Sequence, residues 1–229
     1  MMPRLKVEAL IFDFDGVLLE SEYAGNAQIA AYLTRIGHPT SPEESMARFM
    51  GLAGKDFIAA LETYIGRPLP DDFHAARAEE DARTLAEGLD PVAGAIAFVR
   101  SLPAGLPRAI ASSSSTRWIR THLAHLGIAD AFGDMIFSGR EHVARGKPAP
   151  DIYLHAAQAL GVPIERCAIL EDSPVGATAA VASGAFVIGL SAGRHCPPAH
   201  GDTLRAIGVD AVAHTFAEVA ASLSETSDA

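Results

Sequence analysis

Apolar residues follow two different periodicities in different parts of the chain. The run VEALIF at residues 7–12 is almost entirely apolar and stops at an acidic segment, which is typical of a short strand buried on both faces. After Asp90-Pro91, similar runs alternate with helical segments. This alternation predicts a parallel sheet covered by helices on both faces. We expect further strands at 107–111, 135–137, 167–170, 185–190 and 211–213, and helices at 92–101, 116–126, 151–160, 175–183 and from 216.

Residues 22–87 have only the helical pattern. Apolar side chains recur there at helical spacing, as in Ile29, Tyr32, Leu33 and Ile36. The sequence Ser41-Pro42-Glu43-Glu44 is a helix start, and Gly37 is a helix end. We therefore expect an α/β domain made of residues 1–20 and 88–229, interrupted by an all-helical domain of residues 21–87.

Composition narrows the class of protein. The 229 residues include 49% hydrophobic and 20% charged residues, enough for a buried core and unlike a disordered chain. A net charge of -10 repels nucleic acid, so any bound phosphate should be small and held locally. Two cysteines without metal-ligand spacing favour a reducing compartment, and apolar runs are too short for a membrane span. We expect a cytoplasmic protein without nucleic-acid or membrane partners; the oligomeric state cannot be predicted.

Polar side chains follow four predicted strands, at the sheet edge where α/β proteins bind ligands. They are Asp13 and Asp15, then Ser112 and Ser113, then Lys147, then Glu171 and Asp172. Two acids one residue apart project to the same side of an extended chain, and their charges crowd unless a cation or proton intervenes. Hydroxyls, a lysine and acids for a hard divalent metal are together what phosphoryl transfer requires.

Each of these motifs also has a purely structural interpretation. The DxDG segment is compatible with a turn, and the serines with a helix cap. Lys147 is one of only three lysines, with Lys6 and Lys55, yet an exposed loop lysine is common. Asp172 or Ser173 could simply cap the helix that follows.

Taken together and in this order, the motifs resemble those of the haloacid dehalogenase superfamily, in its branch of phosphatases and phosphomutases with a helical cap. They are DFDGVLLESE at 13–22, IASSSS at 110–115, GKPAPDIY at 146–153 and LEDSPVGATAA at 170–180. The resemblance spans the chain. It implies a doubly wound, Rossmann-like parallel sheet with an inserted helical cap.

The resemblance also implies roles. Asp13 would attack phosphorus and form an aspartyl-phosphate, while Asp15 would protonate the leaving oxygen and then activate water. Ser112, Ser113 and Lys147 would bind the phosphoryl group. Mg²⁺ would be held by the Asp13 carboxylate, the Asp15 backbone carbonyl, Asp172 and, through water, Glu171. Positive charge from Lys147 and Mg²⁺ would offset the charge of the transition state.

The residues also separate relatives within the superfamily. An acid at position 15 argues for phosphate esters rather than halides or phosphonates, and Gly25 replaces the cap-hinge histidine of β-phosphoglucomutases. We therefore expect a Mg²⁺-dependent phosphatase of a small phosphorylated metabolite, of the sugar phosphate or phosphoglycolate type. The alternatives are a phosphomutase and a non-catalytic sensor of a phosphate ligand. In the cap, Glu22 and Lys55 are candidate substrate contacts.

Two features outside the motifs complete the predictions. The loop with His195, Cys196 and His200 could bind a soft metal, but its spacing matches no zinc pattern and favours incidental histidines in a polar loop. Trp118 stands at a core-like position, and we expect it to have a packing role.

Overall fold

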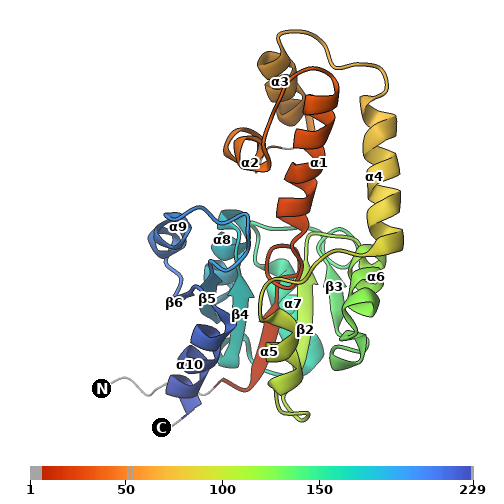
Figure 1. Ribbon diagram of the computed structural model, residues 1–229. Coiled ribbons are helices and arrows are strands. Elements are labelled where there is room, and N and C mark those ends of the chain that lie inside the picture. Colours follow the sequence, from red (N-terminus) through yellow and green to blue (C-terminus); the bar gives the residue numbers. More distant parts are fainter. Residues whose placement is uncertain (1–6, 51, 53, 228–229) are drawn as a thin grey trace. The chain divides into compact units, whose positions relative to one another are not determined.

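The computed structural model describes residues 7–50, 52 and 54–227 (Figure 1). The chain ends and positions 51 and 53 of the segment before Lys55 lie outside the described residues. The described residues form two compact units: residues 7–20 with 90–227, and residues 21–89. We call them the core unit and the helical unit.

The core unit contains a six-stranded parallel sheet in the order β3-β2-β1-β4-β5-β6. Its strands are β1 (Ala9–Phe12), β2 (Arg108–Ser112), β3 (Ile136–Ser138), β4 (Cys167–Glu171), β5 (Phe186–Leu190) and β6 (Ala211–Ala213). The chain starts in the centre and winds outward to both edges, so the predicted doubly wound fold is confirmed.

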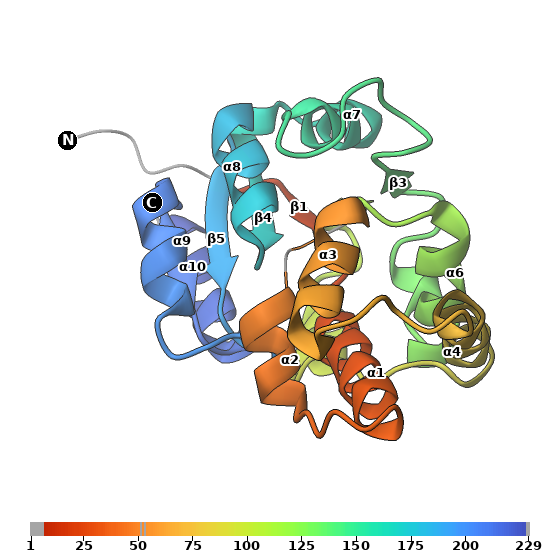
Figure 2. The same cartoon turned by 90° about the horizontal axis from the view of Figure 1, so that it is seen from above.

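Helices cover both faces of this sheet. They are α5 (Ala95–Ser101), α6 (Thr116–Leu126), α7 (Asp151–Leu160), α8 (Pro174–Ser183), α9 (His200–Ile207) and α10 (Phe216–Ser227), with short 3₁₀ turns at Ala129–Ala131 and Ile164–Arg166. Seen from above, α7 and α8 lie together on one side of the strands (Figure 2), whereas α5 and α10 lie in front of them in Figure 1. Within the described residues, every helix is too short or too polar to cross a membrane.

The alternation of side chains along β1 explains the two layers. Ala9 and Ile11 belong to the apolar cluster formed with α7 and α8. Phe12 points to the opposite face, where its ring meets Phe98 of α5 edge-on with 6.2 Å between ring centroids. Strands buried on both faces lack polar alternation, and all four residues of β1 are fully buried.

The helical unit consists of α1 (Ser21–Arg35), α2 (Pro42–Phe49), α3 (Gly54–Ile65) and α4 (Phe73–Glu87). It has its own apolar cluster, which includes Leu33, Phe49 and Leu61. Ser41 and Glu44 form a reciprocal capping box at the start of α2, as the sequence predicts.

One helix of the core unit differs from the prediction. The predicted elements include no helix between the strands expected at 185–190 and 211–213. The structure has α9 from His200 to Ile207, with Leu204 as its one fully buried apolar side chain. Helical periodicity is recognised over windows of roughly 11–18 residues, and α9 has only eight.

Candidate active site

The sheet register brings the predicted residues to one edge. Phe12, the last residue of β1, pairs with Ile110 of β2 on one side and Leu170 of β4 on the other. The residues that follow these three positions therefore emerge side by side. Because β1, β2 and β4 are parallel neighbours, Asp13, Ser112 and Glu171 are brought together although the chain separates them widely.

Asp13, Lys147 and Glu171 form a buried ionic group. The Lys147 ammonium donates to Asp13 Oδ1 at 2.7 Å and to Glu171 Oε1 at 2.6 Å. Lys147 and Glu171 have side chains no more than 4% exposed, and Asp13 is 6% exposed. Burial by itself lowers the pKa of Lys147, but the charges of Asp13 and Glu171 outweigh it and leave that pKa above its usual value. Lys147 is therefore charged and fixed, and the exposed-lysine interpretation does not apply.

Glu171 is held on both carboxylate oxygens. Oε1 also accepts from the Tyr153 hydroxyl at 2.8 Å, and Oε2 accepts from the Ser173 backbone N–H at 2.9 Å and its hydroxyl at 3.1 Å. These donors and Lys147 use both oxygens of the Glu171 carboxylate, so in this structure Glu171 orients Lys147. The Ser173 hydroxyl meanwhile caps α8.

Asp15 accepts hydrogen bonds from side chains at and just after the end of β2. Its Oδ2 accepts from the Ser114 hydroxyl at 2.6 Å and from the Ser112 hydroxyl at 3.3 Å. Its Oδ1 accepts from the Trp118 indole N–H at 3.0 Å. The ring of Trp118 does pack, edge-on against the buried His122 ring with 4.2 Å between centroids, but its indole N–H also holds the acid, which the prediction of a packing role did not include. Ser113 is exposed beside this group.

Three buried acids are grouped closely enough to hold a cation. One carboxylate oxygen from each of Asp13, Glu171 and Asp172 lies within 4.8 Å of the others. Burial raises the pKa of Asp13 well above its usual value; Lys147 opposes this shift, and the negative charges of Glu171, Asp172 and Asp15 add to it. Hard oxygen donors and an excess of negative charge suit a divalent cation such as Mg²⁺, so the residues present fit that group.

Comparison with known proteins decides the family. The family model for haloacid dehalogenase-like hydrolases matches residues 7–184. The chain belongs to the haloacid dehalogenase-like hydrolases. The predicted superfamily and the expectation of a hydrolase are thus confirmed.

Two relatives and one solved structure extend the match. Hexitol phosphatase A of Escherichia coli is 34% identical, with 94% of each chain covered. The 6-phosphogluconate phosphatase of the same organism is 30% identical, covering 84% of this chain and 86% of that protein. The structure of a family hydrolase from Deinococcus radiodurans with bound phosphate and sodium is 32% identical, with a TM-score of 0.85 and 97% of each chain covered. The phosphatase names of both relatives agree with the predicted phosphoric monoester hydrolase class.

In this haloacid dehalogenase-like hydrolase, the loop after β5 contributes to the site as well. His195 Nε2 lies 2.8 Å from Asp172 Oδ2, and His200 Nε2 lies 2.6 Å from the Asp172 backbone oxygen. Both histidines are buried. The interpretation as incidental histidines in a polar loop is therefore wrong, because the hydrophobic pattern cannot show that this loop folds back onto the end of β4.

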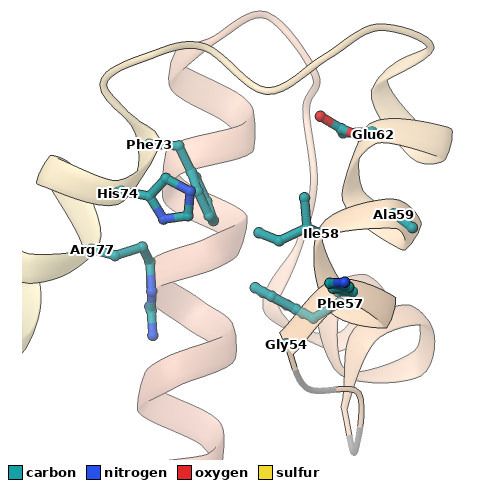
Figure 3. A pocket seen from close by; sticks show the side chains of 9 residues that line it. Gly54, Phe57, Ile58, Ala59, Glu62, Phe73, His74 and Arg77 are labelled. Atoms are coloured by element: carbon teal, nitrogen blue, oxygen red, sulfur yellow. The ribbon is translucent and has the colours of Figure 1, made fainter.

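The two cap candidates belong to the helical unit. Glu22 is exposed in the first turn of α1, and Lys55 is exposed in the first turn of α3. Lys55 lines a pocket of about 610 Å³ between α3 and α4. Figure 3 shows Phe57 and Ile58 on one wall and Phe73, His74 and Arg77 on the other. The pocket walls are mainly aromatic and aliphatic, and Arg77 and His74 are lining residues that the sequence analysis did not single out.

Proposed function

We propose that the protein is a Mg²⁺-dependent phosphatase of a small phosphorylated metabolite and that it works through an aspartyl-phosphate on Asp13. The observation that carries the proposal is the buried group in which Asp13 meets Lys147 beside two further acids. Family membership and the phosphatase relatives support the reaction class. The names of these relatives refer to phosphates of sugar-derived compounds, so we place the substrate of this protein in the same class.

In this proposal the chain's own residues handle the phosphoryl group as follows. Asp13 uses the carboxylate oxygen that Lys147 does not hold to attack phosphorus, and the bond from phosphorus to the ester oxygen breaks. Asp15 gives its proton to that leaving oxygen, and in the second step takes a proton from the water that attacks the phosphorus of the aspartyl-phosphate. Inorganic phosphate leaves, and Asp13 is restored. Acid–base help of this kind typically contributes about 10²–10⁴-fold to the rate.

The remaining groups neutralise and position charge. Lys147 supplies a positive point charge to a phosphoryl oxygen, and Ser112 and Ser113 supply a hydroxyl and a backbone N–H at the start of the segment leading into α6. The Asp13 carboxylate, the Asp15 backbone carbonyl and Asp172 would hold Mg²⁺, with Glu171 acting through water. When bound, Mg²⁺ supplies charge that offsets the negative charge of phosphate and carboxylates.

In this proposal, the helical unit determines which organic leaving groups the protein accepts. We propose that Glu22 and Lys55 contact the organic part of the substrate and that the boundaries near residues 20 and 88 act as hinges. The cytoplasmic location expected from the sparse cysteines stays a prediction.

The test is a phosphate-release assay on a panel of phosphorylated sugars, polyols and carboxylates. Asp13→Asn should abolish release, because an amide oxygen is a very weak nucleophile, and should keep the fold as judged by circular dichroism. Wild-type release should stop with a chelator and return with added Mg²⁺. Full activity of Asp13→Asn would show that another residue attacks phosphorus. Conversion of one phosphate isomer to another without release would identify a mutase.

A further inference from the structure

The loop after β5 and the first residue of α9 bring together two imidazoles and a thiol, which we call the His195–Cys196–His200 cluster. One ring nitrogen of each histidine and the Cys196 sulfur all lie within 4.8 Å of one another. His195 is 5% exposed and His200 is 7% exposed, whereas Cys196 is half-buried. The thiol therefore remains within reach of solvent while the imidazoles are largely shielded. The mechanism proposed above uses none of these three side chains directly.

One separation inside the cluster is close to that between two ligands of the same metal ion. His195 Nε2 lies 3.4 Å from Cys196 Sγ. Around a tetrahedral Zn²⁺, with Zn–N near 2.0–2.1 Å and Zn–S near 2.3 Å, a nitrogen and a sulfur ligand are separated by about 3.6 Å. A small outward movement would therefore be enough to admit the ion. Imidazole and thiolate are also the ligand types that select Zn²⁺-like ions over Mg²⁺.

Two glycines confine the ring of His195. A Cβ on Gly193 would come within 2.5 Å of the His195 Cε1 and Nδ1 atoms, and one on Gly16 would lie 3.0 Å from Cε1. Any larger residue at position 193 would displace the imidazole. The ring is thus fixed by close packing, and a fixed ligand lowers the entropic cost of binding an ion.

The surroundings favour a cation but keep the thiol protonated without one. Asp172 touches His195, and the buried Glu20 carboxylate accepts hydrogen bonds from the neighbouring Arg194 backbone N–H. Burial raises the pKa of Cys196 to about 12, and the Asp172 charge adds to this. The thiolate is the form that acts as nucleophile and metal ligand, so the protonated Cys196 thiol is a weak nucleophile. A soft metal ion can replace its proton.

We propose that His195, Cys196 and His200 form a binding site for a soft divalent metal ion of the Zn²⁺ type, distinct from the acid cluster. Binding would form a metal–sulfur bond, and the thiol proton would leave to solvent. Where the ion takes Nε2 of His195, the ring proton moves to Nδ1 and the contact with Asp172 Oδ2 is lost. Occupation of the site then disturbs a proposed Mg²⁺ ligand. This consequence rests on the proposed function, whereas the site itself does not.

Titration of the full-length, metal-free protein with Co²⁺ tests the site. Co²⁺ commonly substitutes for Zn²⁺, and its bond to a thiolate gives a charge-transfer band in the near ultraviolet. We expect one Co²⁺ per chain to produce this band, Zn²⁺ to abolish it, and an equimolar amount of Mg²⁺ to leave the band in place. Because the readout is absorbance, it is independent of whether the protein hydrolyses any phosphate.

The chain offers a matched pair of cysteine variants. Cys196→Ser should remove the band and weaken Zn²⁺ binding at least tenfold in competition with a chromophoric chelator. Cys167→Ala, at the other free thiol, lies in β4 and should keep the band. Fluorescence of Trp118 reports whether each variant keeps the folded core. Absence of the band in the wild type, or its survival in folded Cys196→Ser, would overturn the proposal.

Discussion

Replacing Glu171 by Gln should destabilise the core unit by about 3–5 kcal/mol, although the two side chains have nearly the same shape. Wild-type Glu171 is completely buried, and donors approach both of its oxygens: Lys147 and Tyr153 on Oε1, and the Ser173 N–H and hydroxyl on Oε2. An amide has one acceptor and one donor end. Whichever way the Gln amide is turned, its NH₂ group faces hydrogen-bond donors, either Lys147 and Tyr153 or the Ser173 N–H and hydroxyl.

The size of the effect follows from the less costly orientation. If the amide oxygen faces Lys147, the NH₂ group faces the Ser173 N–H, which cannot rotate away. One hydrogen bond to a charged group is lost, worth about 1.5–3 kcal/mol, and a buried donor is left unsatisfied at a cost of about 1–3 kcal/mol. Lys147 keeps its contact with Asp13, so the sum stays near the usual loss of about 3–5 kcal/mol for one partner of a buried ion pair.

Urea unfolding measures this difference. The chain has a single tryptophan, Trp118, and it lies in the core unit, so its fluorescence follows that unit without a signal from the helical unit. Tyr153→Phe is the matched control, because it removes one donor and leaves the other three; we expect a loss of about 1.5 kcal/mol. A Glu171→Gln protein within about 0.5 kcal/mol of the wild type would refute the bonding pattern described for Glu171.

Two other changes probe the edge of the sheet. Trp118→Phe removes the indole N–H that donates to Asp15 Oδ1. A hydrogen bond to a charged group is worth about 1.5 kcal/mol, so we expect kcat for phosphate release to fall roughly tenfold. An unchanged kcat would show that the indole only packs and does not help to position Asp15. Gly16→Ala should strongly raise the Mg²⁺ concentration needed for half-maximal activity and lower the melting temperature. Gly16 has a φ of +78°, and an added Cβ would lie 2.0 Å from Asp172 Oδ2. Gly25→Ala is the control, because Gly25 lies in α1 and nothing lies within 4 Å of its added Cβ. It should leave the Mg²⁺ concentration for half-maximal activity unchanged and stabilise the protein by up to about 1 kcal/mol. Equal responses of the two glycine variants would contradict the steric argument.

The sequence predicts the fold well because buried parallel strands have a strong signature. The continuous apolar runs locate all six strands to within two residues at each end, and the rule that ligands bind at strand ends selects Asp13, Lys147 and Asp172. What it cannot predict is how side chains meet across large separations. The hydrogen bond from Trp118 to Asp15 joins residues 103 positions apart, and no periodicity marks it.

The same limit explains the other differences. His195 stands in a loop rich in Pro and Gly, where sequence patterns indicate a turn and no partner. Its contact with Asp172 depends on Gly16 and Gly193 leaving room for the ring, which is a property of the assembled core. Tyr153 is the last residue of the GKPAPDIY motif, yet its role appears only when α7 is packed against the sheet and the hydroxyl reaches Glu171.

The two places where the chain leaves and re-enters the core unit are tied together. Leu19 bridges to Pro91, and backbone hydrogen bonds join Glu20 N to the Asp90 oxygen and Val92 N to the Leu18 oxygen. The intervening stretch is therefore a closed loop of roughly 70 residues, and shortening it to about 8 would save about 2 kcal/mol of closure entropy. Since that stretch also has an apolar centre of its own, it could be exchanged for another of any length whose ends meet, which is how one catalytic scaffold can acquire new substrates without being rebuilt.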